Sequence, residues 1–101
     1  MLHARADPEQ TRCFRKEAEG ADRELNLLYQ RIRTILSPAD QAKLQTAERL
    51  WVQFRDANCA AERELYDGGS AAPMVYAACL WADTRQRTTE LSVMYGWRLE
   101  K

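Results

Sequence analysis

CAAERELYDGGSAAPMVYAAC, residues 59–79, carries a cysteine at each end and the only Gly-Gly pair of the chain between them. Adjacent glycines accept the positive φ values that close a helix, because they have no Cβ to clash with the backbone. Pro73, shortly after the pair, is favoured in the first turn of a new helix. The stretch therefore predicts that one helix ends near Tyr66, that a tight turn follows, and that another helix begins near Ala72.

A second break lies at Ser37-Pro38, upstream of this turn. Ser37 has the side chain of an N-cap, and Pro38 suits the first helical position. Asp40 places a negative charge in the first turn, where it meets the positive end of the helix dipole. The two breaks divide the chain into three expected helices, at residues 9–36, 38–66 and 72–98.

Apolar side chains recur at spacings of three and four in each expected helix, which is the pattern of an amphipathic helix. In the first helix the inward-facing positions are Ala21, Leu25, Leu28, Tyr29, Ile32, Ile35 and Leu36. In the second they are Leu44, Ala47, Trp51, Phe54, Asn58, Cys59 and Leu65. In the third they are Val75, Cys79, Leu80, Thr84, Arg87, Leu91 and Met94. No segment alternates with period two, so the sequence predicts an all-α fold: a three-helix antiparallel bundle, or a helical hairpin with the third helix packed across it.

Length and composition bound the number of domains. At 101 residues, 46% of them hydrophobic and 30% charged, the chain is long enough for one globular domain, expected over residues 9–101. Residues 1–8 are interpreted as a flexible N-terminal segment or, because Ala4-Arg5-Ala6 has the small-x-small form of a signal-peptidase site, as the remnant of an export signal. No stretch approaches the roughly 18 apolar residues of a membrane span.

The three cysteines, Cys13, Cys59 and Cys79, lack both the C-x-x-C spacing and the histidines of a zinc site, so we expect no metal. Cys59 lies about seven residues before the expected end of the second helix and Cys79 about seven after the expected start of the third, which puts both roughly 10 Å from the turn on facing helices. A disulfide between them would close a loop of about 20 residues and stabilise the fold by about 3 kcal/mol. The alternative is a pair of reduced, buried thiols. Cys13 is expected to be free, or to pair with a cysteine upstream of residue 1.

Two arginines fall on or beside the inward stripes, and a buried guanidinium requires a carboxylate partner. The candidate partners of Arg55 are Asp22, Glu24 and Glu90. Arg87 raises the same question, and on the polar side of its helix it has the i,i+4 spacing for a pair with Asp83. A ligand-facing arginine is the alternative. We predict a structural ion-pair network made up of Arg55, Asp22, Arg87 and Glu90.

Residues for catalysis are scarce in this sequence. The sole histidine is His3, which leaves no helical partner for a Ser-His-Asp or Cys-His arrangement. The acidic residues lie where a solvated helix face places them, so no glycosidase-like carboxylate pair stands out. We therefore predict that the protein is not an enzyme and has no cofactor.

Charge and aromatic residues indicate a protein partner. The 15 basic and 15 acidic residues cancel, so no general field attracts nucleic acid or an anionic membrane. Tyr76, Trp81 and Trp97 fall off the third stripe. Exposed aromatic residues often anchor protein contacts, although single ones are also common on surfaces without a role.

Four motifs follow one another along the chain. They are Asp22-x-Glu24-Leu25-Asn26-x-x-Tyr29, Trp51-x-x-Phe54-Arg55-Asp56-x-x-Cys59, Gly68-Gly69-Ser70, and Cys79-Leu80 with Thr84-x-x-Arg87-x-x-Glu90-Leu91. Together they resemble the LprI-type lysozyme inhibitor N-terminal domain family over about residues 21–95. The resemblance implies a small bacterial helical domain, periplasmic or secreted, in which Cys59 and Cys79 pair. The chain departs from the family pattern in having no cysteine upstream of Cys13 and no lipobox cysteine, so a lipid anchor is not expected.

The resemblance predicts a non-catalytic exported binding domain that inhibits a lysozyme or another cell-wall hydrolase, as implied by the member that named the family. The alternative is an immunity or accessory protein that binds another cell-envelope partner. We expect the glycine turn to meet the partner, because a preorganised loop loses little entropy on binding and Glu62, Glu64 and Asp67 form an acidic cluster beside it. The residues expected at this surface are Asp67, Gly68, Gly69, Ser70, Glu64, Tyr76 and Trp81.

Overall fold

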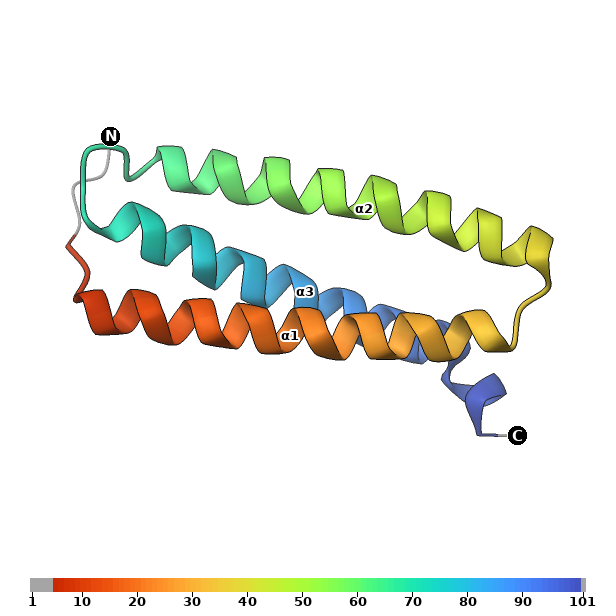
Figure 1. Cartoon of the computed structure of the whole chain (residues 1–101). Helices are drawn as coiled ribbons and strands as arrows, with labels where there is room; N and C mark the ends of the chain where they lie inside the picture. Colours follow the sequence, from red (N-terminus) through yellow and green to blue (C-terminus); the bar gives the residue numbers. More distant parts are fainter. Residues whose placement is uncertain (1–4, 101) are drawn as a thin grey trace.

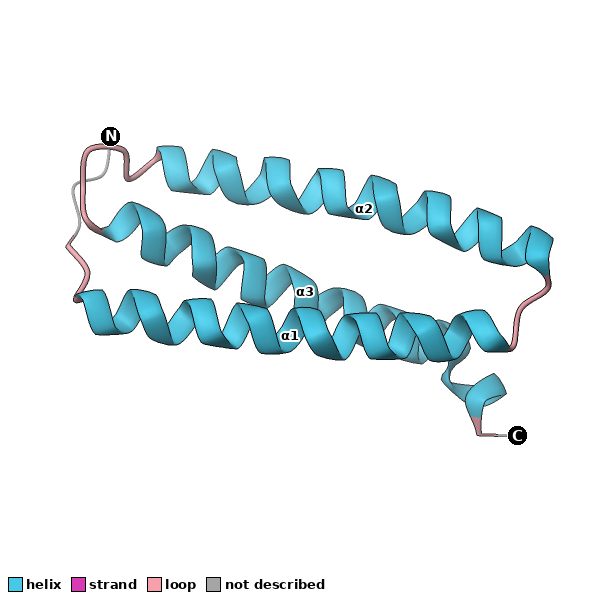
Figure 2. Cartoon of the chain, viewed as in Figure 1, coloured by secondary structure: helices cyan, strands magenta, loops and turns pink. Residues whose placement is uncertain are grey.

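The computed structural model describes residues 5–100, which form a bundle of three long helices (Figure 1). α1 spans Pro8–Thr34, α2 spans Pro38–Glu64 and α3 spans Ala71–Leu99. α2 runs back along the bundle and α3 returns in the direction of α1, so the molecule is elongated, with extents of 49 × 22 × 16 Å. Residues 5–100 contain helices and turns but no strand (Figure 2). The predicted all-α, three-helix fold is confirmed.

The first two helices begin at residues whose side chains cap them. Asp7 Oδ1 accepts a hydrogen bond of 2.9 Å from the Glu9 backbone N–H, and Gln10 Oε1 accepts one of 3.1 Å from the Asp7 N–H. This reciprocal pair is a capping box, which was not predicted. At α2, Ser37 Oγ accepts from the Asp40 N–H at 3.2 Å, so the predicted N-cap is confirmed.

The apolar core lies toward the Ser37 end of the bundle. Its buried members are Leu25, Ile32, Leu36, Leu44 and Leu91. Partly buried side chains pack around them, namely Leu28, Tyr29, Ile35, Trp51, Tyr95 and Leu99. Burying a leucine or isoleucine side chain contributes about 1.5–3 kcal/mol, so this cluster supplies much of the driving force for folding.

α3 packs against both other helices, and more extensively against α1 than against α2. Small side chains such as Ala21 on α1 and Ala77 on α3 are buried toward the glycine-turn half of the bundle. The α2–α3 contact depends more on particular polar and covalent links, which are described below.

The inward face of α2 differs from the prediction. The structure leaves four of the predicted core positions exposed, namely Ala47, Phe54, Asn58 and Leu65. The positions that face the bundle are Leu44, Glu48, Trp51, Arg55 and Cys59. These residues follow helical spacing, but two of them are charged. The prediction relied on apolar side chains and therefore placed residues of a neighbouring, exposed apolar stripe of α2 in the core.

The C-terminal part of α3 shows a smaller difference of the same kind. Met94 was predicted to face inward but is 51% exposed, while Tyr95 packs against the core in its place. Within the described part of the chain, none of the helices is both long enough and apolar enough to cross a bilayer. His3 and Ala4, which entered the predictions about catalysis and export, lie outside the described residues.

Candidate functional site

A disulfide joins α2 to α3 close to the glycine turn. Cys59 and Cys79 are both buried, and their Cα atoms lie 5.5 Å apart. Beside the disulfide, Asn58 Nδ2 donates a hydrogen bond of 2.9 Å to Asp83 Oδ2. The same carboxylate oxygen lies 3.6 Å from the Cys59 sulfur, which is a contact and not a hydrogen bond, because a disulfide sulfur carries no proton. The predicted disulfide is confirmed, and Cys13 is an exposed free thiol on α1.

The turn between α2 and α3 is short and has a defined backbone. Gly68 has φ = 86°, a conformation that disfavours residues with a Cβ. The Gly69 N–H donates to the Tyr66 carbonyl at 3.0 Å. Ser70 Oγ accepts a 3.0 Å hydrogen bond from the Ala6 N–H, so the segment before α1 is tied to the turn. Three kinds of link therefore fix the turn: its own backbone hydrogen bonds, the disulfide between the flanking helices, and the hydrogen bond from Ala6 to Ser70.

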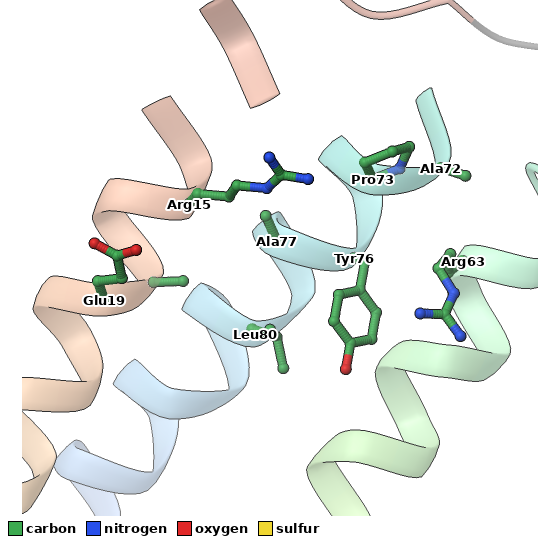
Figure 3. A pocket seen from close by; sticks show the side chains of 9 residues that line it. Arg15, Glu19, Arg63, Ala72, Pro73, Tyr76, Ala77 and Leu80 are labelled. Atoms are coloured by element: carbon green, nitrogen blue, oxygen red, sulfur yellow. The ribbon is translucent and has the colours of Figure 1, made fainter. Parts of the chain in front are cut away.

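A groove of about 480 Å³ opens beside this turn (Figure 3). All three helices contribute to its lining, which consists of Arg15, Ala18, Glu19, Arg63, Ala72, Pro73, Tyr76, Ala77 and Leu80. Arg15 from α1 and Arg63 from α2 approach it from opposite sides, and the Tyr76 ring projects between them (Figure 3). The guanidinium carbon of Arg63 lies 4.6 Å from the Tyr76 ring centroid.

This groove combines small apolar side chains and the Tyr76 ring with two guanidinium groups and one carboxylate, that of Glu19. A guanidinium matches the planar geometry of a carboxylate and pairs with it through two parallel hydrogen bonds. The groove is therefore suited to an acidic group carried on an apolar segment. Arg15 and Arg63 were not among the predicted site residues, because only the packing of three helices brings residues so distant in sequence to one groove.

The predicted partner-binding residues divide between two faces. Glu64 ends α2 and is exposed, Tyr76 lines the groove, and the turn residues lie next to both. Trp81 lies elsewhere, because five residues along a helix correspond to a rotation of about 140° from Tyr76. Its ring centroid is 5.8 Å from that of Phe14, and the Arg85 guanidinium carbon lies 5.3 Å above it.

The predicted ion-pair residues also separate into two groups. Arg87 is buried, and its Nε and Nη2 atoms lie 2.6 Å and 2.5 Å from Glu48 Oε1 on α2, while Glu90 is 3.8 Å away. The predicted pair of Arg87 with Asp83 is wrong, because Arg87 turns inward to Glu48 and Asp83 accepts from Asn58. Glu48 was missed, although its spacing of four residues from Leu44 and three from Trp51 puts it on the inward face.

Arg55 forms the second group. Its Nη2 atom is 2.9 Å from Asp56 Oδ1, and its Nη1 atom is 3.9 Å from Asp22 Oδ1 on α1. Its guanidinium carbon also lies 5.2 Å from the Trp51 ring centroid. Arg55 thereby bridges α2 to α1 over an aromatic face, which agrees with a structural role.

A second, more polar groove of about 330 Å³ runs between α1 and α2. It is lined by Asp22, Leu25, Asn26, Tyr29, Gln45, Glu48, Arg49, Trp51, Val52 and Arg55. Six of these residues belong to the first two sequence motifs. Much of those two motifs therefore lies where α1 and α2 face each other, whereas Cys59 bonds to α3 and Phe54 is exposed.

Comparison with known proteins agrees with this architecture. The family profile described as "Lysozyme inhibitor LprI" matches residues 3–91, which is most of the chain. The chain belongs to the LprI family. The fold is also that of a DUF1311 family protein from Pseudomonas putida KT2440, whose crystal structure superposes with a TM-score of 0.76. That structure shares 24% sequence identity, and the match covers 88% of this chain and 93% of the other.

A curated relative of this LprI-family chain is an uncharacterised protein of Rhizobium meliloti (strain 1021). It is 30% identical over 92 residues, which cover 78% of this chain and 66% of that protein. The chain thus spans just under two thirds of the length of this relative. Membership in the LprI family confirms the resemblance seen in the four motifs.

Proposed function

We propose that this domain is a non-catalytic binding protein that inhibits a lysozyme or a related cell-wall hydrolase, with the disulfide-held turn as its contact surface. Membership in an inhibitor family carries this proposal. The turn residues Asp67 to Ser70 and the adjacent Arg15–Arg63 groove form the part of the molecule that supports it best.

The rigidity of the turn supports this role. Binding a flexible loop costs the entropy of ordering it, whereas a loop that is already fixed avoids most of that cost. Here the disulfide closes the base of the turn, and the Ser70–Ala6 hydrogen bond holds one side of it. Gly68 and Gly69 carry no side chains, so the centre of the turn presents only backbone to a substrate cleft.

The charges around the turn fit the surface of such an enzyme. Glycosidases commonly place two carboxyl groups in the cleft, about 5–9 Å apart. The guanidinium groups of Arg15 and Arg63 are suited to pair with a carboxylate there. Glu62, Glu64 and Asp67 are exposed at the same end of the bundle and complement a basic rim.

We also propose that the domain acts outside the cytoplasm, in the periplasm or as a secreted protein. Stable disulfides are typical of oxidising compartments, and Cys59–Cys79 is buried in the bundle. Cell-wall hydrolases act in those same compartments.

Inhibition can be measured by adding the purified domain, in molar excess, to lysozymes of several structural classes that clear a suspension of bacterial cell walls. We expect saturable inhibition of at least one class, with one domain bound per enzyme molecule. The absence of inhibition in every class would overturn the proposal.

A pair of charge reversals locates the contact surface. Arg63→Glu, beside the turn, is expected to weaken inhibition by about tenfold or more, since removing a central anchor typically has an effect of that size. Arg85→Glu, beside Trp81 on the other face, serves as the matched control and should leave inhibition unchanged. If Arg85→Glu weakened inhibition and Arg63→Glu did not, the contact surface would lie on the Trp81 face instead.

A further inference from the structure

α2 carries a second apolar stripe on the side that faces away from the bundle. Its members repeat at spacings of three and four and are Ala47, Leu50, Phe54, Ala57, Ala61 and Leu65. All six are exposed, and the exposed fractions of the three large ones are 60% for Leu50, 61% for Phe54 and 53% for Leu65. The 3-4 repeat is the pattern of a helix that packs along another helix.

This stripe is separate from the face that holds α2 in the bundle. At about 100° per residue, the centre of the stripe lies about 120° around the helix from the centre of the inward face formed by Leu44, Trp51 and Cys59. α2 forms one edge of the molecule, and no described residue of the chain covers its outer side (Figure 1). Contiguous exposed apolar stripes of this kind mark interaction sites, because isolated apolar residues are normal but rows of them are not.

We propose that the outer stripe of α2 is the surface on which a second copy of this chain packs, with the two α2 helices antiparallel. Such a dimer has two-fold symmetry, so each stripe must complement itself. The order of large and small residues along the stripe does so.

With the two-fold axis between residues 55 and 56, Phe54 lies opposite Ala57 of the second copy and Leu50 lies opposite Ala61. The two central large side chains then each meet an alanine, and Leu65 lies opposite Thr46, which allows the helices to interdigitate and approach closely. In a parallel pair, Phe54 would instead meet Phe54 and Ala57 would meet Ala57, leaving a bulge beside a gap.

The charges beside the stripe favour the same orientation. Lys43, whose side chain is 82% exposed, precedes the stripe, while Glu64 and Asp67 lie at its other end. Antiparallel pairing places Lys43 about 6 Å along the helix direction beyond Glu64, the last residue of α2 in the second copy. Parallel pairing would bring the two Lys43 side chains together, and like charges there disfavour it. The dimer places the two glycine turns at opposite ends, and Glu64 of each copy then faces Lys43 of the other, while Arg63 lies about 160° around α2 from the centre of the stripe, outside the contact.

The state of association can be measured by sedimentation equilibrium of the chain with Cys13→Ser, which removes the free thiol and any disulfide through it. We expect a concentration-dependent monomer–dimer equilibrium. Phe54→Glu should raise the dissociation constant by about tenfold or more, because it buries a charge at the centre of the contact. Leu27→Glu on α1, where Leu27 is 68% exposed and off the stripe, is the matched control and should not change it. Circular dichroism confirms that both variants remain folded.

Cross-linking tests the orientation without a destabilising substitution. In the Cys13→Ser background, Ala57→Cys places the two new thiols near the two-fold axis, offset by only about 5 Å along the helix direction, whereas Ala47→Cys offsets them by about 25 Å. A short bismaleimide should therefore join Ala57→Cys chains and not Ala47→Cys chains. A chain that stays monomeric up to its solubility limit, a dimer unaffected by Phe54→Glu, or equal cross-linking at both positions would each overturn the proposal.

Discussion

Arg87 on α3 and Glu48 on α2 form a buried ion pair midway along the bundle, with side chains only 11% and 14% exposed. Toward the glycine turn, the Asn58–Asp83 hydrogen bond and the Cys59–Cys79 disulfide link the same two helices. Toward the Ser37 end, Leu44 and Leu91 belong to the apolar core. α2 is therefore attached to α3 by a series of distinct links and not by one continuous apolar seam.

The ion pair gives the first prediction. Glu48→Ala should lower the free energy of unfolding by about 3 kcal/mol, because it leaves the Arg87 guanidinium buried without its main partner. Urea unfolding followed by circular dichroism measures the change. Glu90→Ala is the control, since Glu90 is half-exposed and 3.8 Å from Arg87, and it should cost well under about 1 kcal/mol. Equal losses for the two variants would contradict the assigned pairing.

Removing the disulfide should cost a similar amount. Cys59→Ala with Cys79→Ala is expected to lower the free energy of unfolding by about 3 kcal/mol, since the cross-link closes a loop between residues 20 apart. A reductant should destabilise the unmodified chain by about as much and have no effect on the double variant. Cys13→Ser changes an exposed free thiol and keeps the disulfide. Its urea unfolding should therefore match that of the unmodified chain, both with and without the reductant.

Two apolar truncations distinguish the inward and outward faces of the helices. Leu91→Ala should cost about 2–5 kcal/mol, because Leu91 is fully buried and its loss leaves a cavity. Phe54→Ala should change the stability of the monomer by less than about 1 kcal/mol, because the ring is 61% exposed. Thermal unfolding at low protein concentration, where the monomer predominates, gives both values. A loss at Phe54 as large as at Leu91 would mean that Phe54 belongs to the core.

Two glycine substitutions are expected to have opposite signs. Gly68→Ala should destabilise the domain by about 1–2 kcal/mol, because a Cβ disfavours the positive φ of 86°. Gly20→Ala, inside α1, should stabilise it by about 0.5–1 kcal/mol, since alanine is the better helix former. The added methyl group would meet Arg23 Nη2 at 3.7 Å, an ordinary contact distance. Chemical denaturation of both variants checks the signs, and a stable Gly68→Ala protein would argue against the backbone assigned to the turn.

The helices and the disulfide could be predicted because they depend on local signals. Ser37-Pro38, the Gly-Gly pair and the apolar repeats act over a few residues, and equal spacing from the turn brings Cys59 and Cys79 together. The inward face of α2 could not be predicted in the same way. Two of its positions are Glu48 and Arg55, whose burial depends on partners in other helices, and the outer apolar stripe supplied a competing pattern.

The candidate site shows the same limit. One end of the bundle holds the turn residues, Glu64 and Tyr76. Their proximity could be predicted because they are neighbours in sequence. Trp81 falls on another face because of helical rotation alone. Arg15 and Arg63 come from different helices, so their convergence on one groove becomes visible only once the three helices are packed.

The hydrogen bond between the Ala6 N–H and Ser70 Oγ decides how the protein should be handled in a binding measurement. It draws the start of α1 up to the glycine turn, whereas α3 ends at the far side of the bundle (Figure 1). An affinity tag or fluorophore fused ahead of α1 would crowd the proposed contact surface. Immobilisation through the end of α3 presents the turn to solution, and a drop in binding on moving the label from the end of α3 to the start of α1 would itself report which end of the molecule the partner approaches.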